Sequence, residues 1–220
     1  MSGCCDSSGY ADVFGGRFAR AQVRRYRKRG LDATARLLVD FLAGRGLEGA
    51  TVLEVGGGIG EIQLELLRRG AARTTNLELV KEYDAPARHL AEEEGVADRV
   101  DRRILDVATS PQQVEAADVV VLHRVVCCYP DYEKLLRAAA DHATRRLVLS
   151  YPPPTLLNRA VIGVDNGWRR LRGNTFRAFT HSPDDMMRVL HDAGLRTSYQ
   201  HHGRIWHVVG LERPVVPEAA

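Results

Sequence analysis

Short runs of apolar residues alternate along this chain with polar segments in which apolar residues recur at helical spacing. The predicted strands lie at Thr51–Val55, Thr74–Leu79, Val100–Leu105, Asp118–Leu122 and Arg146–Tyr151, and the fourth is apolar throughout after its first residue. Continuous apolar strands separated by helices are typical of a parallel sheet that is covered on both faces. The pattern therefore predicts an α/β protein with a doubly wound sheet.

The last part of the chain predicts a helix and an antiparallel pair of strands. Ser182 followed by Pro183 and two carboxylates is typical of a helix start, and that helix should end at Gly194. Few residues separate the segments Leu195–Tyr199 and Ile205–Leu211, so the two are expected to pair directly. His201 and His202 are expected to be solvated in the turn between them. The fold class predicted is a Rossmann-like, seven-stranded, mostly parallel sheet with an antiparallel last strand. Residues 152–180 interrupt the alternation and are predicted to be an insertion.

The N-terminal part divides into two segments of different composition. Residues 1–16 are small and polar, which predicts a flexible arm. Residues 17–46 predict two helices, the first rich in arginine and ending at Gly30, the second capped by Asp32. The main domain is expected to span residues 47–213.

Composition narrows the class of protein further. A chain of 220 residues with 45% hydrophobic residues predicts one globular domain, with no apolar window long enough to span a bilayer. The cysteines form two adjacent pairs, Cys4-Cys5 and Cys127-Cys128, which fit neither a zinc pattern nor a disulfide framework. These features predict a reduced, cytoplasmic protein with no membrane partner and no metal. The net charge of +3 is too small to indicate nucleic acid binding.

A glycine-rich loop follows the first strand and carries the most informative chemistry. Glu54 precedes Gly56, Gly57, Gly58 and Gly60, an arrangement that lets a ligand approach the backbone and the next helix N-terminus. Glu61 stands where a dinucleotide fingerprint has its third glycine, and a pyrophosphate is disfavoured beside carboxylates. A ligand with an ammonium and a sulfonium group but no phosphate suits this loop. S-adenosylmethionine has that chemistry.

Two more acidic residues end successive strands. Glu78 lies 22 residues beyond Gly56 and is followed by Leu79, where a carboxylate can accept both ribose hydroxyls. Asp106 follows the third strand, where it can accept the adenine amino group while the Val107 backbone N–H donates. Because ligands bind at the carboxyl edge of open α/β sheets, the three acidic positions predict one nucleoside site.

With these residues the sequence resembles the class I S-adenosylmethionine-dependent methyltransferases over about residues 30–211. The resemblance implies that the glycines line the methionine portion of the cofactor and that Glu54 lies near its amino group. It also implies that Glu78 holds the ribose and that Asp106 and Val107 contact adenine. The segment Arg177–Asp185, and more loosely Tyr129-Pro130, is similar to magnesium-protoporphyrin O-methyltransferases.

The residues after the fourth strand are expected to face the transferring methyl group. His123 is a candidate for cofactor contact or for the general base, or it packs at the strand end. Arg124 either pairs with an acidic substrate or is solvated. Aromatic and arginine residues in the insertion suit a planar, carboxylate-bearing substrate, unless the aromatics pack on the sheet; they include Trp168, Phe176 and Phe179.

Three functions stay open at this point. The first is methyl transfer to a small molecule by in-line displacement, with the basic helix as a lid from which Tyr26 or Arg27 reaches the cofactor. The second is an RNA or protein methyltransferase that uses the basic helix to contact its substrate. The third is a non-catalytic sensor of S-adenosylmethionine. The cysteine pairs would form a soft-metal or arsenic site only if the arm folded over the fourth strand.

Overall fold

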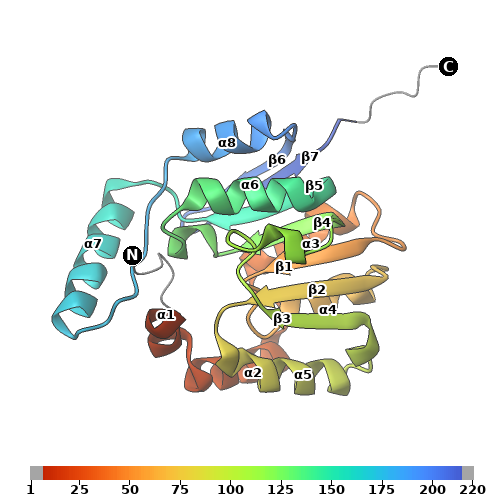
Figure 1. The fold of residues 1–220 in the computed structure, drawn as a ribbon, viewed down its shortest axis with the longest axis horizontal. Coiled ribbons are helices and arrows are strands. Elements are labelled where there is room, and N and C mark those ends of the chain that lie inside the picture. The colour runs from red at the N-terminus through yellow and green to blue at the C-terminus, as the bar shows by residue number, and fades with distance from the viewer. Residues whose placement is uncertain (1–6, 215–220) are drawn as a thin grey trace.

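The computed structural model describes residues 7–214 and contains a single seven-stranded sheet (Figure 1). The strand order is β3-β2-β1-β4-β5-β7-β6. The bounds are β1 Thr51–Val55, β2 Arg73–Glu78, β3 Val100–Ile104, β4 Ala117–His123, β5 Ala143–Tyr151, β6 Arg196–His202 and β7 His207–Glu212. Every strand predicted from the sequence is present.

The direction of the strands agrees with the predicted fold class. Strands β1 to β5 pair in parallel, whereas β7 pairs antiparallel with both β5 and β6. The chain order reverses between β1 and β4, so the crevice for a ligand opens at the carboxyl ends of these strands. The prediction of a mostly parallel sheet with an antiparallel last strand is confirmed.

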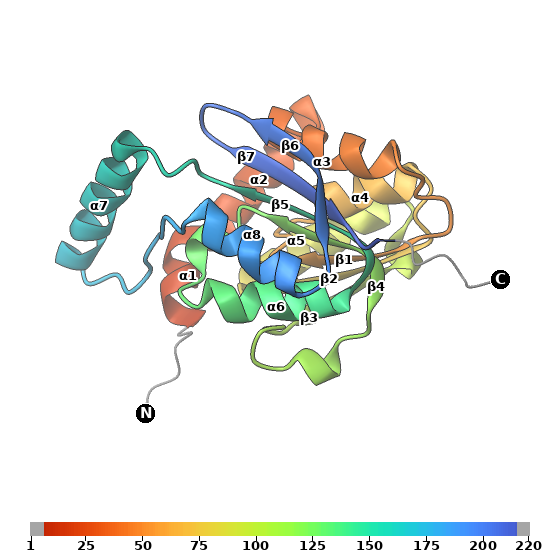
Figure 2. The same ribbon diagram turned by 90° about the horizontal axis from the view of Figure 1, so that it is seen from above.

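Helices cover both faces of the sheet and bury two hydrophobic clusters (Figures 1 and 2). One cluster joins α2, α3, α4 and α5 to the sheet, and the other joins α6 and α8 to the opposite face. The helices are α1 Ser7–Phe14, α2 Gly16–Arg29, α3 Ala33–Ala43, α4 Glu61–Arg68, α5 Asp84–Glu93, α6 Tyr132–His142, α7 Leu156–Leu171 and α8 Pro183–Asp192. Four short 3₁₀ turns complete the described elements: η1 Lys81–Tyr83, η2 Ala97–Arg99, η3 Pro111–Gln113 and η4 Val126–Cys128.

Helix α1, Ser7–Phe14, corrects the predicted flexible arm of residues 1–16 for the part that lies within the described residues. Its Tyr10 and Phe14 rings meet the Phe176 ring edge to face, with centroids 5.6 and 5.3 Å apart. Gly9 is buried, and a Cβ there would lie 2.3 Å from Thr175 Oγ1, so the glycine permits close approach of the two segments. Contact with a distant segment, rather than local propensity, stabilises this helix. Cys4 and Cys5 lie outside the described residues.

The turn between the last two strands also differs from its predicted place. His201 and His202 belong to β6, where they pair with Val208 and His207, and both side chains are exposed. The predicted insertion contains α7, which lies at the edge of the molecule (Figure 2). Within residues 7–214, no helix combines the length and the apolar character needed to cross a bilayer.

Candidate active site

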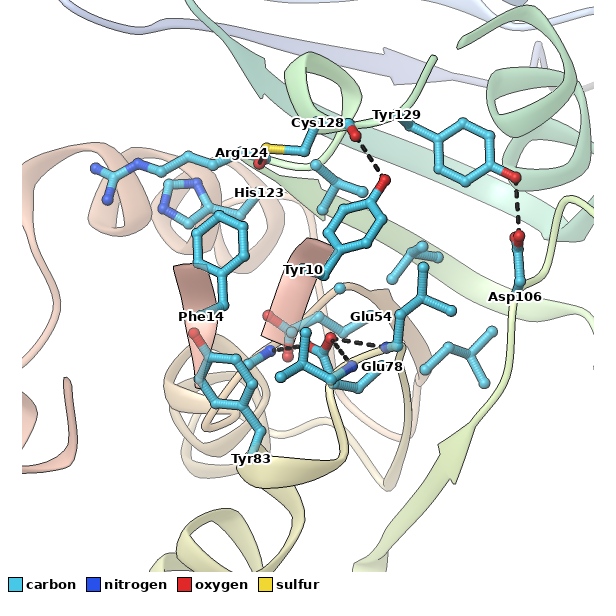
Figure 3. Close-up of a pocket in the computed structure, with 18 of the residues that line it drawn as sticks. Tyr10, Phe14, Glu54, Glu78, Tyr83, Asp106, His123, Arg124, Cys128 and Tyr129 are labelled. Carbon is cyan, nitrogen blue, oxygen red and sulfur yellow. Dashed lines mark hydrogen bonds between the residues drawn. The ribbon is translucent and has the colours of Figure 1, made fainter. Parts of the chain in front are cut away.

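A cavity of about 220 Å³ lies at the carboxyl ends of β1, β2, β3 and β4 (Figure 3). Its floor is formed by the glycine loop and the residues that follow these strands. Helices α1 and α2 supply Tyr10, Phe14, Phe18 and Gln22 to its wall. Sheet, loop and N-terminal helices thus enclose one site.

The glycine loop depends on backbone conformations that favour glycine. Gly56 has φ +65° and Gly58 has φ +54°, in the left-handed region. A Cβ on Gly56 would lie 2.7 Å from Val125 Cγ2, and one on Gly57 would lie 2.1 Å from Asn76 Nδ2. These three glycines line the cavity, whereas Gly60 does not: it is the N-cap of helix α4, where the Gln63 side chain occupies the space of a Cβ.

Glu54 lies beneath the loop and is almost fully buried. Its Oε2 accepts a hydrogen bond of 3.4 Å from Asn76 Nδ2. Burial, together with the negative charge of Glu61, raises the pKa of Glu54 to about 8, while Arg102 acts in the opposite direction. The carboxyl group is thus largely protonated at neutral pH, and a cation beside it would favour ionisation.

Glu78 is oriented by the backbone of two loops. Its Oε1 accepts from the Leu79 and Val80 N–H groups at 2.7 and 3.0 Å, and its Oε2 accepts from the Gly58 N–H at 2.9 Å. Leu79 itself lines the cavity. The carboxylate therefore joins the glycine loop to the end of β2 (Figure 3) and has acceptor capacity left on Oε2.

Asp106 has a partner that the sequence pattern did not assign to the site. The Tyr129 hydroxyl donates to Asp106 Oδ2 at 2.8 Å, and the Ala108 N–H donates to Oδ1 at 2.9 Å. Val107, between them, lines the cavity. Tyr129 drew attention only through the loose likeness of Tyr129-Pro130, and only the packing of the η4 segment brings it to Asp106.

His123 and Arg124 lie at the end of β4. His123 Nδ1 is 2.9 Å from Ser150 Oγ, which also accepts from the Arg124 N–H at 3.0 Å. Burial first, and then the charge of Arg124, lower the pKa of His123 to about 3. The imidazole is therefore neutral throughout the physiological range and is a weak proton acceptor.

Arg124 is held in an uncommon backbone conformation, with φ +60°. Its guanidinium pairs with Asp32 at 2.8 Å and lies 4.9 Å from the Trp206 ring centroid. Its Nε is buried without a hydrogen-bond partner among the described residues. A cation with a spare donor thus lies on the cavity wall beside His123.

The N-terminal helices cover the cavity, but not through the residue predicted. Tyr26 is buried away from it, where its hydroxyl accepts from Arg68 at 3.1 Å; its assignment as a cofactor contact is corrected. Arg27 instead pairs with Glu93 on α5. The covering residues Tyr10 and Phe14 are four positions apart in α1, a helical spacing, and Phe18 follows in α2 after the break at Gly15.

The second cysteine pair lies at the edge of the cavity. Cys127 and Cys128 are free thiols with their sulfurs 3.8 Å apart, and Cys128 lines the cavity. The Tyr10 hydroxyl donates to the Cys128 carbonyl at 2.6 Å and so ties α1 to η4 (Figure 3). No cluster of three metal-binding side chains occurs within residues 7–214.

The fold and the site together define an α/β protein with a crevice at the carboxyl edge of its sheet that acidic residues line. The chain belongs to the methyltransferase-domain family, whose model matches residues 23–200. Proteins of this family use S-adenosylmethionine as methyl donor, so the cofactor prediction is confirmed.

A curated relative covers a smaller part of the chain. The ribosomal protein L11 methyltransferase of Aeromonas hydrophila is 37% identical over 92 residues, which are 42% of this chain and 30% of the relative. The chain thus matches less than a third of that relative's length.

Two solved structures illustrate the range of similar folds. Magnesium protoporphyrin IX methyltransferase from Synechocystis PCC 6803, with bound SAH, has a TM-score of 0.74 at 20% identity and covers 95% of this chain and 100% of its own. A putative RNA methyltransferase from Pyrococcus horikoshii has a TM-score of 0.58 at 14% identity, covering 83% and 84%. At these identities the likeness establishes the fold and leaves the substrate open.

Proposed function

We propose that this protein transfers a methyl group from S-adenosylmethionine to a small, planar, acidic molecule. The observation that carries the proposal is a cavity lined by four acidic residues, Glu54, Glu61, Glu78 and Asp106, and covered by aromatic side chains from α1 and α2. Carboxylates suit a cationic nucleoside without phosphate, and the aromatic cover suits a flat acceptor.

The residues of the cavity fit the cofactor part by part. Glu54, and Gln22 Oε1, a buried acceptor without a partner among the described residues, suit the ammonium group. Glu78 has acceptor capacity left for a ribose hydroxyl, and Asp106 with the Val107 N–H suits the adenine edge. When bound, the cofactor supplies an activated methyl group on a sulfonium. The protein's task is to align the acceptor in line with that group and to exclude water.

His123 contributes to alignment in this proposal rather than to proton removal. A group whose pKa is about 3 gains little from accepting a proton near neutrality. An acidic acceptor, already ionised, needs no base. Arg124 lines the cavity and supplies a positive charge for such an acceptor, and its guanidinium also lies 4.9 Å from the Trp206 ring centroid.

The charges of α2 favour the lid over an RNA-binding surface. Arg25 pairs with Glu61 at 3.1 Å and with Asp32 at 3.4 Å, and Arg27 pairs with Glu93. These arginines therefore hold α2 against the domain, and less of the helix charge is left for a phosphate backbone. Arg124 also pairs with Asp32, which links the lid to the methyl end of the cavity.

Two measurements test the proposal. Calorimetric titration with S-adenosylhomocysteine should show binding, and Glu78→Gln should weaken it while the exposed neighbour variant Glu82→Gln should not. A screen with labelled methyl donor should then label a metabolite fraction rather than RNA. Label in RNA, or binding without transfer to either pool, would replace this proposal with the RNA or sensor function.

A further inference from the structure

Helix α7 exposes its apolar residues, whereas an ordinary surface helix buries them. Amphipathic helices of globular proteins bury the apolar stripe and expose the polar one. In α7 no residue is buried, and six large apolar residues are more than half exposed. Their exposed fractions are Leu156 84%, Leu157 73%, Val161 58%, Val164 74%, Trp168 55% and Leu171 83%.

The polar face of α7 is the one that contacts the rest of the protein. The Asn166 side chain exchanges two hydrogen bonds with the Ala178 backbone, at 2.8 and 2.9 Å, and Asn158 Nδ2 donates to the Pro153 carbonyl at 2.9 Å. These polar contacts fix the rotation of the helix. They leave the apolar residues on the outer side, where all six stay more than half exposed and the Arg172 guanidinium lies 4.5 Å from the Trp168 ring centroid.

Five of the six exposed apolar residues form one continuous stripe. Leu157, Val161, Val164, Trp168 and Leu171 follow one another at spacings of four and three residues, which places them on a single face of the helix. Scattered exposed apolar residues are common on protein surfaces, but a contiguous stripe marks an interaction site.

The charges on α7 indicate the chemistry of the occupant. Arg159, Arg170 and Arg172 are exposed, and none has a carboxylate partner in the part of the chain that the structure describes. The single acidic residue of the helix, Asp165, is paired with Arg169 at 2.6 Å. The apolar stripe is thus accompanied by net positive charge, which favours an anionic occupant.

We propose that α7 docks on an anionic lipid surface, with its apolar stripe in the headgroup region and its arginines at the phosphates. An apolar stripe with tryptophan and leucine beside an arginine-rich polar face is typical of helices that lie in the plane of a membrane. The helix lies at the edge of the molecule, clear of the sheet and of α8, so a flat surface can reach it (Figures 1 and 2). A second copy is less suited, because two such helices side by side would oppose arginines without carboxylates between them.

A helix docked in this way lies on the membrane and does not span it. The composition of the chain argued only against a spanning segment. A spanning helix needs about 20 apolar residues, whereas α7 has 16 residues and would lie on the surface. Gly163 and Gly167 lower the intrinsic stability of the helix, and a Cβ on either would meet nothing within 4 Å. Burial of the stripe in lipid would stabilise a helix that now packs mainly through polar contacts.

Vesicle flotation of the full chain tests the proposal. The protein should float with phosphatidylcholine vesicles that contain phosphatidylglycerol and should stay behind with phosphatidylcholine alone. Substituting Leu157→Gln, Val164→Gln and Leu171→Gln together should weaken binding about tenfold or more, because affinity scales with buried apolar area. Arg159→Gln with Arg170→Gln should reduce binding and its sensitivity to salt. Ile104→Gln, at an exposed apolar residue on β3, is the matched control and should bind as the parent does.

Further readouts can refute the proposal whether or not the protein transfers a methyl group. Trp168 emission should shift to the blue on anionic vesicles, and Trp168→Phe should abolish the shift. Circular dichroism should show that each variant keeps the parent's fold, since the substituted side chains are exposed. Absent flotation, flotation that the triple variant retains, or a dimer in light scattering that the triple variant loses would each overturn the assignment. None of these measurements depends on methyl transfer.

Discussion

Replacement of Glu78 by glutamine probes both the architecture and the ligand chemistry of the site. The carboxylate accepts three backbone N–H bonds, from Gly58, Leu79 and Val80. The single oxygen of a glutamine amide can keep the two bonds at Leu79 and Val80. Its NH₂ group then faces the Gly58 N–H, so two donors oppose each other and one bond is lost.

The magnitude follows from that one lost bond. A hydrogen bond to a charged group contributes about 1.5–3 kcal/mol, and Glu78 is buried, so we expect the free energy of unfolding to fall by about 2 kcal/mol. The acceptor for a ribose hydroxyl loses its charge as well. At about 1.4 kcal/mol per tenfold, S-adenosylhomocysteine should bind roughly tenfold to a hundredfold more weakly.

Urea unfolding and calorimetry measure the two effects separately. The unfolding midpoint should fall at an unchanged dependence on urea concentration, which indicates lost stability without a changed unfolded state. Glu82→Gln is the matched control, because Glu82 is exposed on the adjoining turn. If Glu78→Gln kept the parent's stability and its affinity for the nucleoside, Glu78 would have neither a structural role in the loop nor a role in holding the ribose.

Three further predictions concern other parts of the molecule. Since the pKa of Glu54 is raised to about 8, a cation that binds beside it must displace a proton. The affinity for the nucleoside should therefore rise from about pH 6 to 8, and calorimetry should detect the released proton. Glu54→Gln should remove both effects. His123→Asn should lower the methyl-transfer rate by less than about tenfold, whereas loss of a general base costs roughly 10²–10⁴-fold; single-turnover kinetics distinguish the two. Gly210→Ala should destabilise the fold by about 1–3 kcal/mol, because its Cβ would lie 2.3 Å from Phe41 Cζ. Gly163→Ala is the control, because a Cβ there meets nothing within 4 Å. A urea midpoint of Gly210→Ala equal to that of the parent would contradict the packing argument.

The sequence alone determined the sheet and the position of the site along it. A central strand such as β4 is apolar nearly throughout because it is buried on both faces, and such a run is visible without any partner, whereas β3 at the sheet edge carries Asp101, Arg102 and Arg103. Glu54, Glu78 and Asp106 could be placed together because parallel strands put their carboxyl ends at one edge. The glycine loop was readable because positive φ at Gly56 and Gly58 limits the residue type.

Tertiary structure decided the features that depend on distant contacts. Helix α1 forms because Tyr10 and Phe14 pack on Phe176, a residue far along the chain, and no local pattern among small polar residues reveals that contact. Tyr129 reaches Asp106, and Tyr26 turns to Arg68, for the same reason. The pKa of His123 also depends on burial by several elements. Local sequence fixes backbone preference and periodicity, whereas the direction of a side chain and the water around it depend on which other elements pack against it.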